Sequence, residues 1–170
     1  MCSQSSVERP STWNAQSPSL NANCQLVKVL SGTREYAGVH DRLRATMPQA
    51  KIMRLERVQN VLLWEFYQMR KQMLRKTNAG RDPNEVSVWH GTSQHDPKGI
   101  YEDRQDGFMT QHSGNGMWGR GLYFAEKASY SNQYAHKLPS ASDTGSTRSF
   151  LLAKLLVGDE VEVMVRFPFI

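Results

Sequence analysis

The sequence predicts an α+β domain, and two observations support this prediction. Short segments with the alternating hydrophobic pattern of strands are interspersed with segments that show the spacing of amphipathic helices. The chain of 170 residues, 39% of them hydrophobic, has the size of one globular domain and enough apolar side chains for one core. We expect residues 1–23, rich in Ser, Asn, Gln and Pro, to be a flexible polar leader and residues 24–170 to form the domain.

The first half of the domain is predicted to alternate between strands and helices. Residues 25–30 and 51–58 have strand-like alternation, and residues 33–45 form a helix that stops before Pro48, because a residue preceding proline is pushed out of the α region. Asn60 can cap a second helix that ends near residue 80. The helix carries one apolar stripe, which we interpret as core: Leu62, Phe66, Met69 and Met73.

The second half is predicted to contain more strands and one short helix. In residues 86–90, Val86, Val88 and His90 share one face of a strand. Residues 121–125, 150–157 and 161–165 are further strand candidates. A helix over residues 127–136 would place Ser131 and Tyr134 one turn apart.

Composition argues against several classes of protein. No apolar run reaches the roughly 18 residues of a membrane helix, so we expect an intracellular protein, in the nucleus or cytoplasm, without a membrane partner. The only cysteines, Cys2 and Cys24, have no spacing typical of a disulfide framework or zinc site. Asp96, Asp106 and His112 also match no metal-site spacing, so we predict no metal.

The positive charge is concentrated in residues 42–81. This segment holds ten Lys or Arg against Glu56 and Glu65, whereas the whole chain has a net charge of +5. Such a face is usually solvated helix surface, and it would also attract a negatively charged dinucleotide. A nucleic-acid-binding module that uses residues 42–81 is one alternative function, although the sequence does not favour it.

A Gly-x-Gly-x-x-Gly pattern occurs at Gly114, Gly116 and Gly119. In a dinucleotide-binding fold this motif follows a strand and opens a helix, so that backbone N–H groups meet the pyrophosphate. Here the glycines lead into the predicted strand 121–125. We therefore reject the Rossmann interpretation and predict a mobile loop.

A longer ordered set of motifs is more specific. It consists of His-Gly-Thr at 90–92, Gly99-Ile100, Gly107-Phe108, Gly-Arg-Gly-Leu-Tyr-Phe-Ala at 119–125 and Ser-x-Ser-x-x-Tyr at 129–134. It resembles the catalytic domain of the poly(ADP-ribose) polymerase family, the diphtheria-toxin-like ADP-ribosyltransferases. The upstream residues 57–60 and the Leu-Trp-x-x-Tyr pattern at 63–67 are similar to the mono-ADP-ribosylating branch. The resemblance covers residues 36–159 and implies split antiparallel sheets with flanking helices.

The resemblance also implies a donor site for NAD and a protein acceptor, without a metal. His90 would hydrogen-bond ribose hydroxyls, and the Gly91 backbone would hold the nicotinamide carboxamide. Thr92 would add a hydroxyl contact, and Tyr123 would line the nicotinamide ribose. Ser131 would bond the carboxamide, and Tyr134 would stack on the ring. The catalytic residues implied are His90 and Tyr123.

The family's third signature residue lies on a late strand, beyond the segment that residues 150–159 resemble. We therefore expect a domain that is truncated at its C-terminus and lacks its last strands, and we do not assign Glu160 or Glu162 to that role. The function that the resemblance implies is transfer of mono-ADP-ribose from NAD to a protein side chain. A catalytically silent fragment of the same fold that binds NAD or a partner remains the other alternative.

Overall fold

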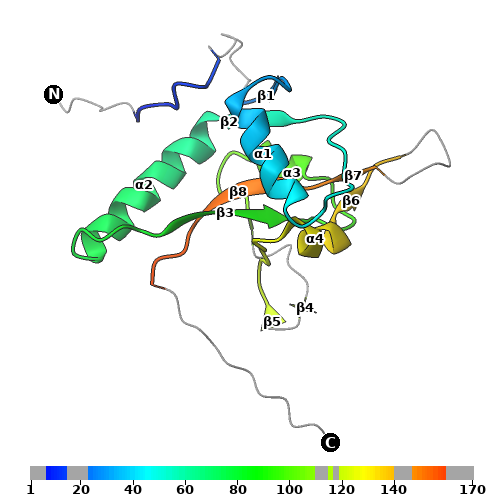
Figure 1. The fold of residues 1–170 in the computed structure, drawn as a ribbon. Helices are drawn as coiled ribbons and strands as arrows, with labels where there is room; N and C mark the ends of the chain where they lie inside the picture. Colours follow the sequence, from blue (N-terminus) through cyan, green and yellow to red (C-terminus); the bar gives the residue numbers. More distant parts are fainter. Residues whose placement is uncertain (1–6, 15–22, 110–114, 117–118, 140–146, 160–170) are drawn as a thin grey trace, which may run out of the picture.

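The structure is a computed structural model, and it describes residues 7–14, 23–109, 115–116, 119–139 and 147–159. Helices and strands are mixed along the chain (Figure 1), which confirms the predicted α+β class. The helices are α1 (Arg34–Arg44), α2 (Val61–Thr77), α3 (Lys98–Tyr101), α4 (Ala128–Ser131) and the 3-10 helix η2 (Asn132–Tyr134). The strands are β1 (Cys24–Lys28), β2 (Glu56–Asn60), β3 (Glu85–His90), β4 (Asn115–Gly116), β5 (Gly119–Arg120), β6 (His136–Lys137), β7 (Arg148–Ser149) and β8 (Leu151–Leu156).

The described strands pair two by two, and every pair is antiparallel. β1 pairs with β2 so that Cys24 lies opposite Asn60, and β3 pairs with β8 so that His90 lies opposite Leu151. The pairs β4–β5 and β6–β7 each join two-residue strands. β3 and β8 are six residues each and lie far apart in the sequence, and their ladder carries His90 at its end.

The segment 121–125 does not form the continuous strand that the sequence predicts. Only Ala125 pairs with β3: its carbonyl accepts from the Trp89 N–H at 2.7 Å, and its own N–H donates to the Trp89 carbonyl at 2.9 Å. Two residues earlier, the Tyr123 carbonyl bonds the ring of His90. This side-chain bond replaces the ladder bond that a strand would make at Tyr123.

Local capping explains where the longer helices begin. Thr33 accepts a hydrogen bond from the Tyr36 N–H at 3.2 Å, and Asn60 accepts one from the Leu63 N–H at 3.0 Å. These contacts confirm the predicted helix at residues 33–45 and the predicted cap at Asn60. The predicted strand 51–58 is wrong over residues 51–55, because the five residues of β1 pair with residues 56–60. The helix predicted over 127–136 ends at Tyr134.

The core lies between α1, the β3–β8 ladder and α4. Its buried members are Leu43, Trp89 and Ala128, and partly buried apolar residues pack around them. The ring of Phe150 meets the ring of Trp89 edge-on, with 5.2 Å between the centroids. The side chain of Trp89 thus belongs to the core, while the next residue, His90, begins the wall of a pocket.

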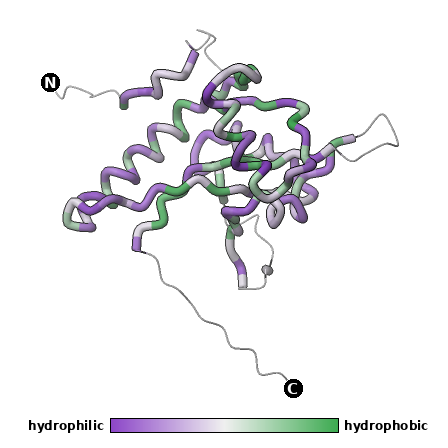
Figure 2. Tube along the Cα trace, viewed as in Figure 1, coloured by the Kyte–Doolittle hydropathy of each residue, from purple (hydrophilic) through white to green (hydrophobic). Residues whose placement is uncertain are grey.

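Three residues of the predicted core stripe of α2 are exposed, whereas the fourth, Leu62, is partly buried. Phe66, Met69 and Met73 are 44%, 53% and 48% exposed, so their interpretation as core is wrong. The tube of α2 in Figure 2 alternates between hydrophilic and hydrophobic residues along its length. Polar contacts set its rotation instead: the Tyr67 hydroxyl donates to Glu85 at 2.7 Å, and the Lys71 amine bonds the same carboxylate.

Part of the predicted leader makes specific contacts with β2 and α2. The rings of Trp13 and Trp64 lie 5.8 Å apart. The buried Gln59 side chain donates to the Asn14 carbonyl at 3.2 Å and accepts from the Asn14 N–H at 3.3 Å.

At the other end of the chain, the predicted strand 161–165 lies outside the described residues. Within the described residues, α2 and the shorter helices are too short or too polar to span a bilayer.

Candidate donor-nucleotide site

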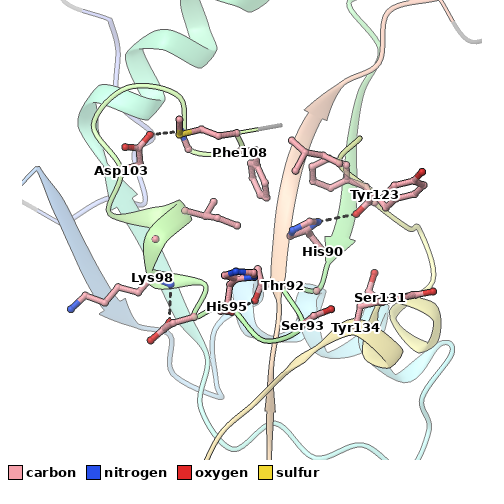
Figure 3. A pocket seen from close by; sticks show the side chains of 18 of the residues that line it. His90, Thr92, Ser93, His95, Lys98, Asp103, Phe108, Tyr123, Ser131 and Tyr134 are labelled. Atoms are coloured by element: carbon pink, nitrogen blue, oxygen red, sulfur yellow. Dashed lines mark hydrogen bonds between the residues drawn. The ribbon is translucent and has the colours of Figure 1, made fainter. Parts of the chain in front are cut away.

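A pocket of about 1040 Å³ opens where β3 ends. Figure 3 shows side chains converging on it from β3, from the segment before α3, and from α4 and η2. All the residues that the sequence analysis selected line this pocket: His90, Gly91, Thr92, Tyr123, Ser131 and Tyr134. The structure thus brings together side chains that are spread over more than forty residues of sequence.

His90 is buried at the end of β3, with 8% of its surface exposed. Its Nδ1 atom lies 2.8 Å from the Tyr123 carbonyl oxygen (Figure 3). A carbonyl can only accept, so Nδ1 carries the hydrogen and the neutral ring keeps Nε2 as an acceptor. Burial lowers the pKa of His90 below 6.5, although the bond to the Tyr123 carbonyl acts in the opposite direction. The ring is therefore mainly neutral at neutral pH.

Two phenylalanines hold the His90 ring in place. The Phe108 ring meets it edge-on at a centroid distance of 5.1 Å, and the Phe124 ring lies 5.0 Å away on a tilted plane. The two phenylalanine rings are themselves 5.1 Å apart. Sequence reasoning did not select either as a site residue, although Phe108 follows Gly107 and Phe124 follows Tyr123 in the motif set. That adjacency was the available signal.

Gly91 allows the turn at 131–134 to approach the end of β3. A Cβ atom on Gly91 would lie 2.5 Å from the Tyr134 carbonyl carbon and 2.7 Å from the Ser131 backbone carbonyl oxygen. The Ser93 N–H donates to the Tyr134 carbonyl at 2.6 Å, and the buried Ser131 hydroxyl donates to the Trp89 carbonyl at 3.0 Å. The donor of Ser131 is thus in use, while its oxygen can still accept a bond.

Aromatic side chains with exposed surface line one side of the pocket. Tyr134 is 49% exposed and Tyr130 is 46% exposed, and their rings lie 5.8 Å apart. The Tyr123 ring packs against Gly116, where a Cβ atom would be 2.3 Å from the ring. The Tyr123 hydroxyl donates to the Gly119 carbonyl at 2.6 Å. Gly116 therefore provides space for Tyr123.

The glycine motif does not open a helix. Gly119 begins β5, which pairs with β4, and this agrees with rejection of the Rossmann interpretation. Gly114 and most of the predicted mobile loop lie outside the described residues. Nor do the described residues bring three His, Cys, Asp or Glu side chains together as metal ligands.

The Thr92 hydroxyl donates its hydrogen to the His95 carbonyl at 2.5 Å, which leaves the hydroxyl oxygen as an acceptor.

The α+β fold and the pocket at the end of β3 agree with the protein family to which the sequence belongs. The chain belongs to the poly(ADP-ribose) polymerase catalytic domain family, whose model matches residues 33–167. This membership confirms the predicted family and supports an NAD⁺ ADP-ribosyltransferase enzyme class.

Among its relatives, the chain is 36% identical to the protein mono-ADP-ribosyltransferase PARP12 of Mus musculus, over 83% of this chain and 19% of the relative. It is 34% identical to a probable poly [ADP-ribose] polymerase of Dictyostelium discoideum, over 88% of this chain and 44% of the relative. It is 28% identical to the protein mono-ADP-ribosyltransferase PARP11 of Mus musculus, over 95% of this chain and 52% of the relative. The chain thus spans between a fifth and about half of the length of these curated relatives.

Proposed function

We propose that this chain transfers a single ADP-ribose unit from NAD to a protein side chain and releases nicotinamide. The observation that carries the proposal is the convergence of His90, Gly91 and Tyr134 on one pocket at the end of β3. The names of PARP12 and PARP11 as mono-ADP-ribosyltransferases support transfer of one unit rather than a polymer.

The pocket residues suit the parts of NAD that they would bind. Nicotinamide in NAD is a flat cation, and the exposed face of Tyr134 can stack on it, which contributes about 0.5–2 kcal/mol. The backbone of Gly91 can meet the donor and the acceptor of the carboxamide, and the Ser131 oxygen can accept from its amide. His90 Nε2 can accept from a ribose hydroxyl, while Thr92 and Tyr123 line the same pocket.

The reaction breaks the bond between the ribose anomeric carbon and the pyridinium nitrogen. Nicotinamide leaves as a neutral molecule with the electron pair of that bond, and the ribose becomes oxocarbenium-like. The acceptor side chain then bonds the anomeric carbon and releases its proton to water. The walls of the pocket contribute by holding donor and acceptor in line, since positioning lowers the barrier of a two-substrate reaction.

The proposal is tested by incubating the chain with NAD labelled in its adenine half and measuring label on protein. We expect labelling by the wild type and its loss in His90→Ala. His40→Ala is the matched control, because His40 is exposed on α1 outside the pocket and should leave labelling unchanged. Binding of benzamide, a nicotinamide analogue, is measured by calorimetry in parallel. Benzamide binding without labelling would identify a silent NAD-binding domain, and absence of both would overturn the proposal.

A further inference from the structure

Asn60 lies outside the pocket, yet its side-chain amide bonds the segment that forms one pocket wall. The residue is 4% exposed. Its Nδ2 atom donates to the Tyr101 carbonyl at 3.0 Å and to the Asp103 carbonyl at 2.7 Å. Its Oδ1 atom accepts from the Leu63 N–H at 3.0 Å and from Asn23 Nδ2 at 2.9 Å. One amide thus joins the start of α2 to the turn that follows α3.

That turn is organised by Asp103, which lines the pocket. Its carboxylate accepts from the Asp106 N–H at 2.8 Å and from the Gly107 N–H at 2.7 Å. These bonds stabilise the charged form and lower the pKa of Asp103. Gly107 has a φ of +66°, a conformation that favours glycine, and it directs the chain to Phe108.

Phe108 connects this turn to the predicted catalytic histidine. Its ring reaches toward His90 from the opposite wall of the pocket (Figure 3), and it meets the imidazole edge-on at 5.1 Å. A displacement of the turn would therefore remove one of the two aromatic rings that fix the orientation of His90.

Helix capping alone does not account for these contacts. An N-cap needs only a side-chain oxygen, and Asp or Ser performs that task about as well as Asn. The two bonds from Nδ2 to carbonyls need an amide donor, which neither Asp nor Ser has at that position. An aspartate at position 60 would keep the cap and place a carboxylate against two carbonyl oxygens.

We propose that Asn60 is a positioning residue for the donor pocket, because its amide holds the turn at 101–107 so that Phe108 packs on His90. The inference rests on the proposed function, in that the pocket positioned is the NAD site. Asn60 itself touches no donor atom, since it lies outside the pocket lining.

The test is Asn60→Asp, with two measurements that fail independently. We expect the Kd for NAD to rise about tenfold, the effect of losing one or two hydrogen bonds that order a binding wall. We also expect faster hydrogen exchange at the Asp106 and Gly107 amides, with the Leu63 amide protected as in wild type. Thr33→Ala is the control: it removes the cap of α1, whose bonds are to Leu30 and Tyr36 and not to the turn, and should leave both readings unchanged.

Wild-type Kd and wild-type exchange at Gly107 in Asn60→Asp would overturn the inference. If Asn60→Asp does not fold, Asn60→Ser keeps a capping oxygen and removes both Nδ2 bonds to the Tyr101 and Asp103 carbonyls, and the same two changes are expected. If wild type fails to bind NAD, the proposed function is wrong, and exchange at Asp106 and Gly107 still decides whether Asn60 positions the turn.

Discussion

The backbone of Gly91 passes so close to Tyr134 that a Cβ atom at position 91 would lie 2.5 Å from the Tyr134 carbonyl carbon and oxygen. Gly91→Ala should therefore push the turn at 131–134 away from β3. We expect it to lower the free energy of unfolding by about 1–3 kcal/mol, as overpacking does, and to abolish most binding of benzamide. Urea denaturation and calorimetry measure the two effects.

Gly38→Ala provides the matched control for this substitution. Gly38 lies inside α1, and a Cβ there would have no atom within 4 Å. The same change should stabilise the protein by about 0.5–1 kcal/mol through helix propensity and leave benzamide binding intact. If both variants denature and bind like wild type, the close approach at Gly91 has no energetic role.

Burial of His90 predicts a pH dependence of stability. The pKa of His90 is lowered from 6.5 in the folded state, so the unfolded state binds more protons between the two values. The contribution of neutral His90 to stability is therefore complete above pH 6.5 and is lost as the pH falls through the folded pKa. An NMR titration should show the His90 ring titrating below 6.5. A pKa at or above that value would contradict the buried, carbonyl-bonded geometry.

Local sequence patterns predicted the elements whose contacts are local. Thr33 and Asn60 cap helices through bonds to residues three positions ahead, and such bonds can be read from sequence. The prediction of a continuous strand over residues 121–125 was wrong. The Tyr123 carbonyl in this segment bonds the ring of His90, which lies thirty-three residues earlier in the sequence. Alternation alone cannot show that a backbone carbonyl is taken by a side chain.

The same limit applies to the site. The residues that bear the family motif were predicted, and they line one pocket. Phe108 was missed as a site residue because its contact with His90 depends on the path of the turn after α3. Asn60 was interpreted only as a cap, since its bonds to the Tyr101 and Asp103 carbonyls span more than forty residues.

The exposure of Phe66 and Met69 on α2 predicts small effects of their substitution on stability, whereas the hydrophobic spacing predicts large ones. Met69→Gln and Phe66→Gln should each lower the free energy of unfolding by less than about 1 kcal/mol, because Phe66 is 44% and Met69 53% exposed already. Leu63→Ala should cost about 1–3 kcal/mol, since Leu63 packs beneath Gly107, whose Cβ would lie 3.3 Å from it. Denaturant titration of the three variants checks this, and a larger cost at Met69 than at Leu63 would reverse the assigned rotation of α2.

The contacts of residues 7–14 predict that Trp13 stabilises the domain. Trp13→Ala removes a ring that lies 5.8 Å from Trp64, and such aromatic pairs contribute about 0.5–1.5 kcal/mol beyond their buried area. We expect the unfolding free energy to fall by at least that amount and the Trp64 indole N–H, which donates to the Glu8 carbonyl at 3.0 Å, to exchange faster with solvent. Met53→Ala, at a side chain that is 79% exposed, is the control and should have no effect. Unchanged exchange of the Trp64 indole N–H in Trp13→Ala would mean that Trp13 does not cover Trp64.

Glu85 joins α2 to the β3–β8 ladder through its charge. Burial raises the pKa of Glu85, but bonds from Lys154, Lys71 and Tyr67 outweigh it and lower the pKa from 4.5 to about 2. Because the folded pKa is the lower one, this contribution is complete above pH 4.5 and is lost as the pH falls through about 2. Glu85→Gln should therefore cost about 1 kcal/mol at neutral pH, less than the pKa shift alone implies because water screens a partly exposed cluster, and the difference from wild type should shrink with acid. Urea midpoints across this pH range measure it, with Glu102→Gln as the control, because the ion pair of Glu102 with Lys98, at 3.7 Å, is exposed. A cost that stays constant down to the lowest pH would contradict this, since the loss of a charge has no effect once the wild-type carboxylate is protonated; the cost of Glu85→Gln would then come from the different shape of the glutamine side chain.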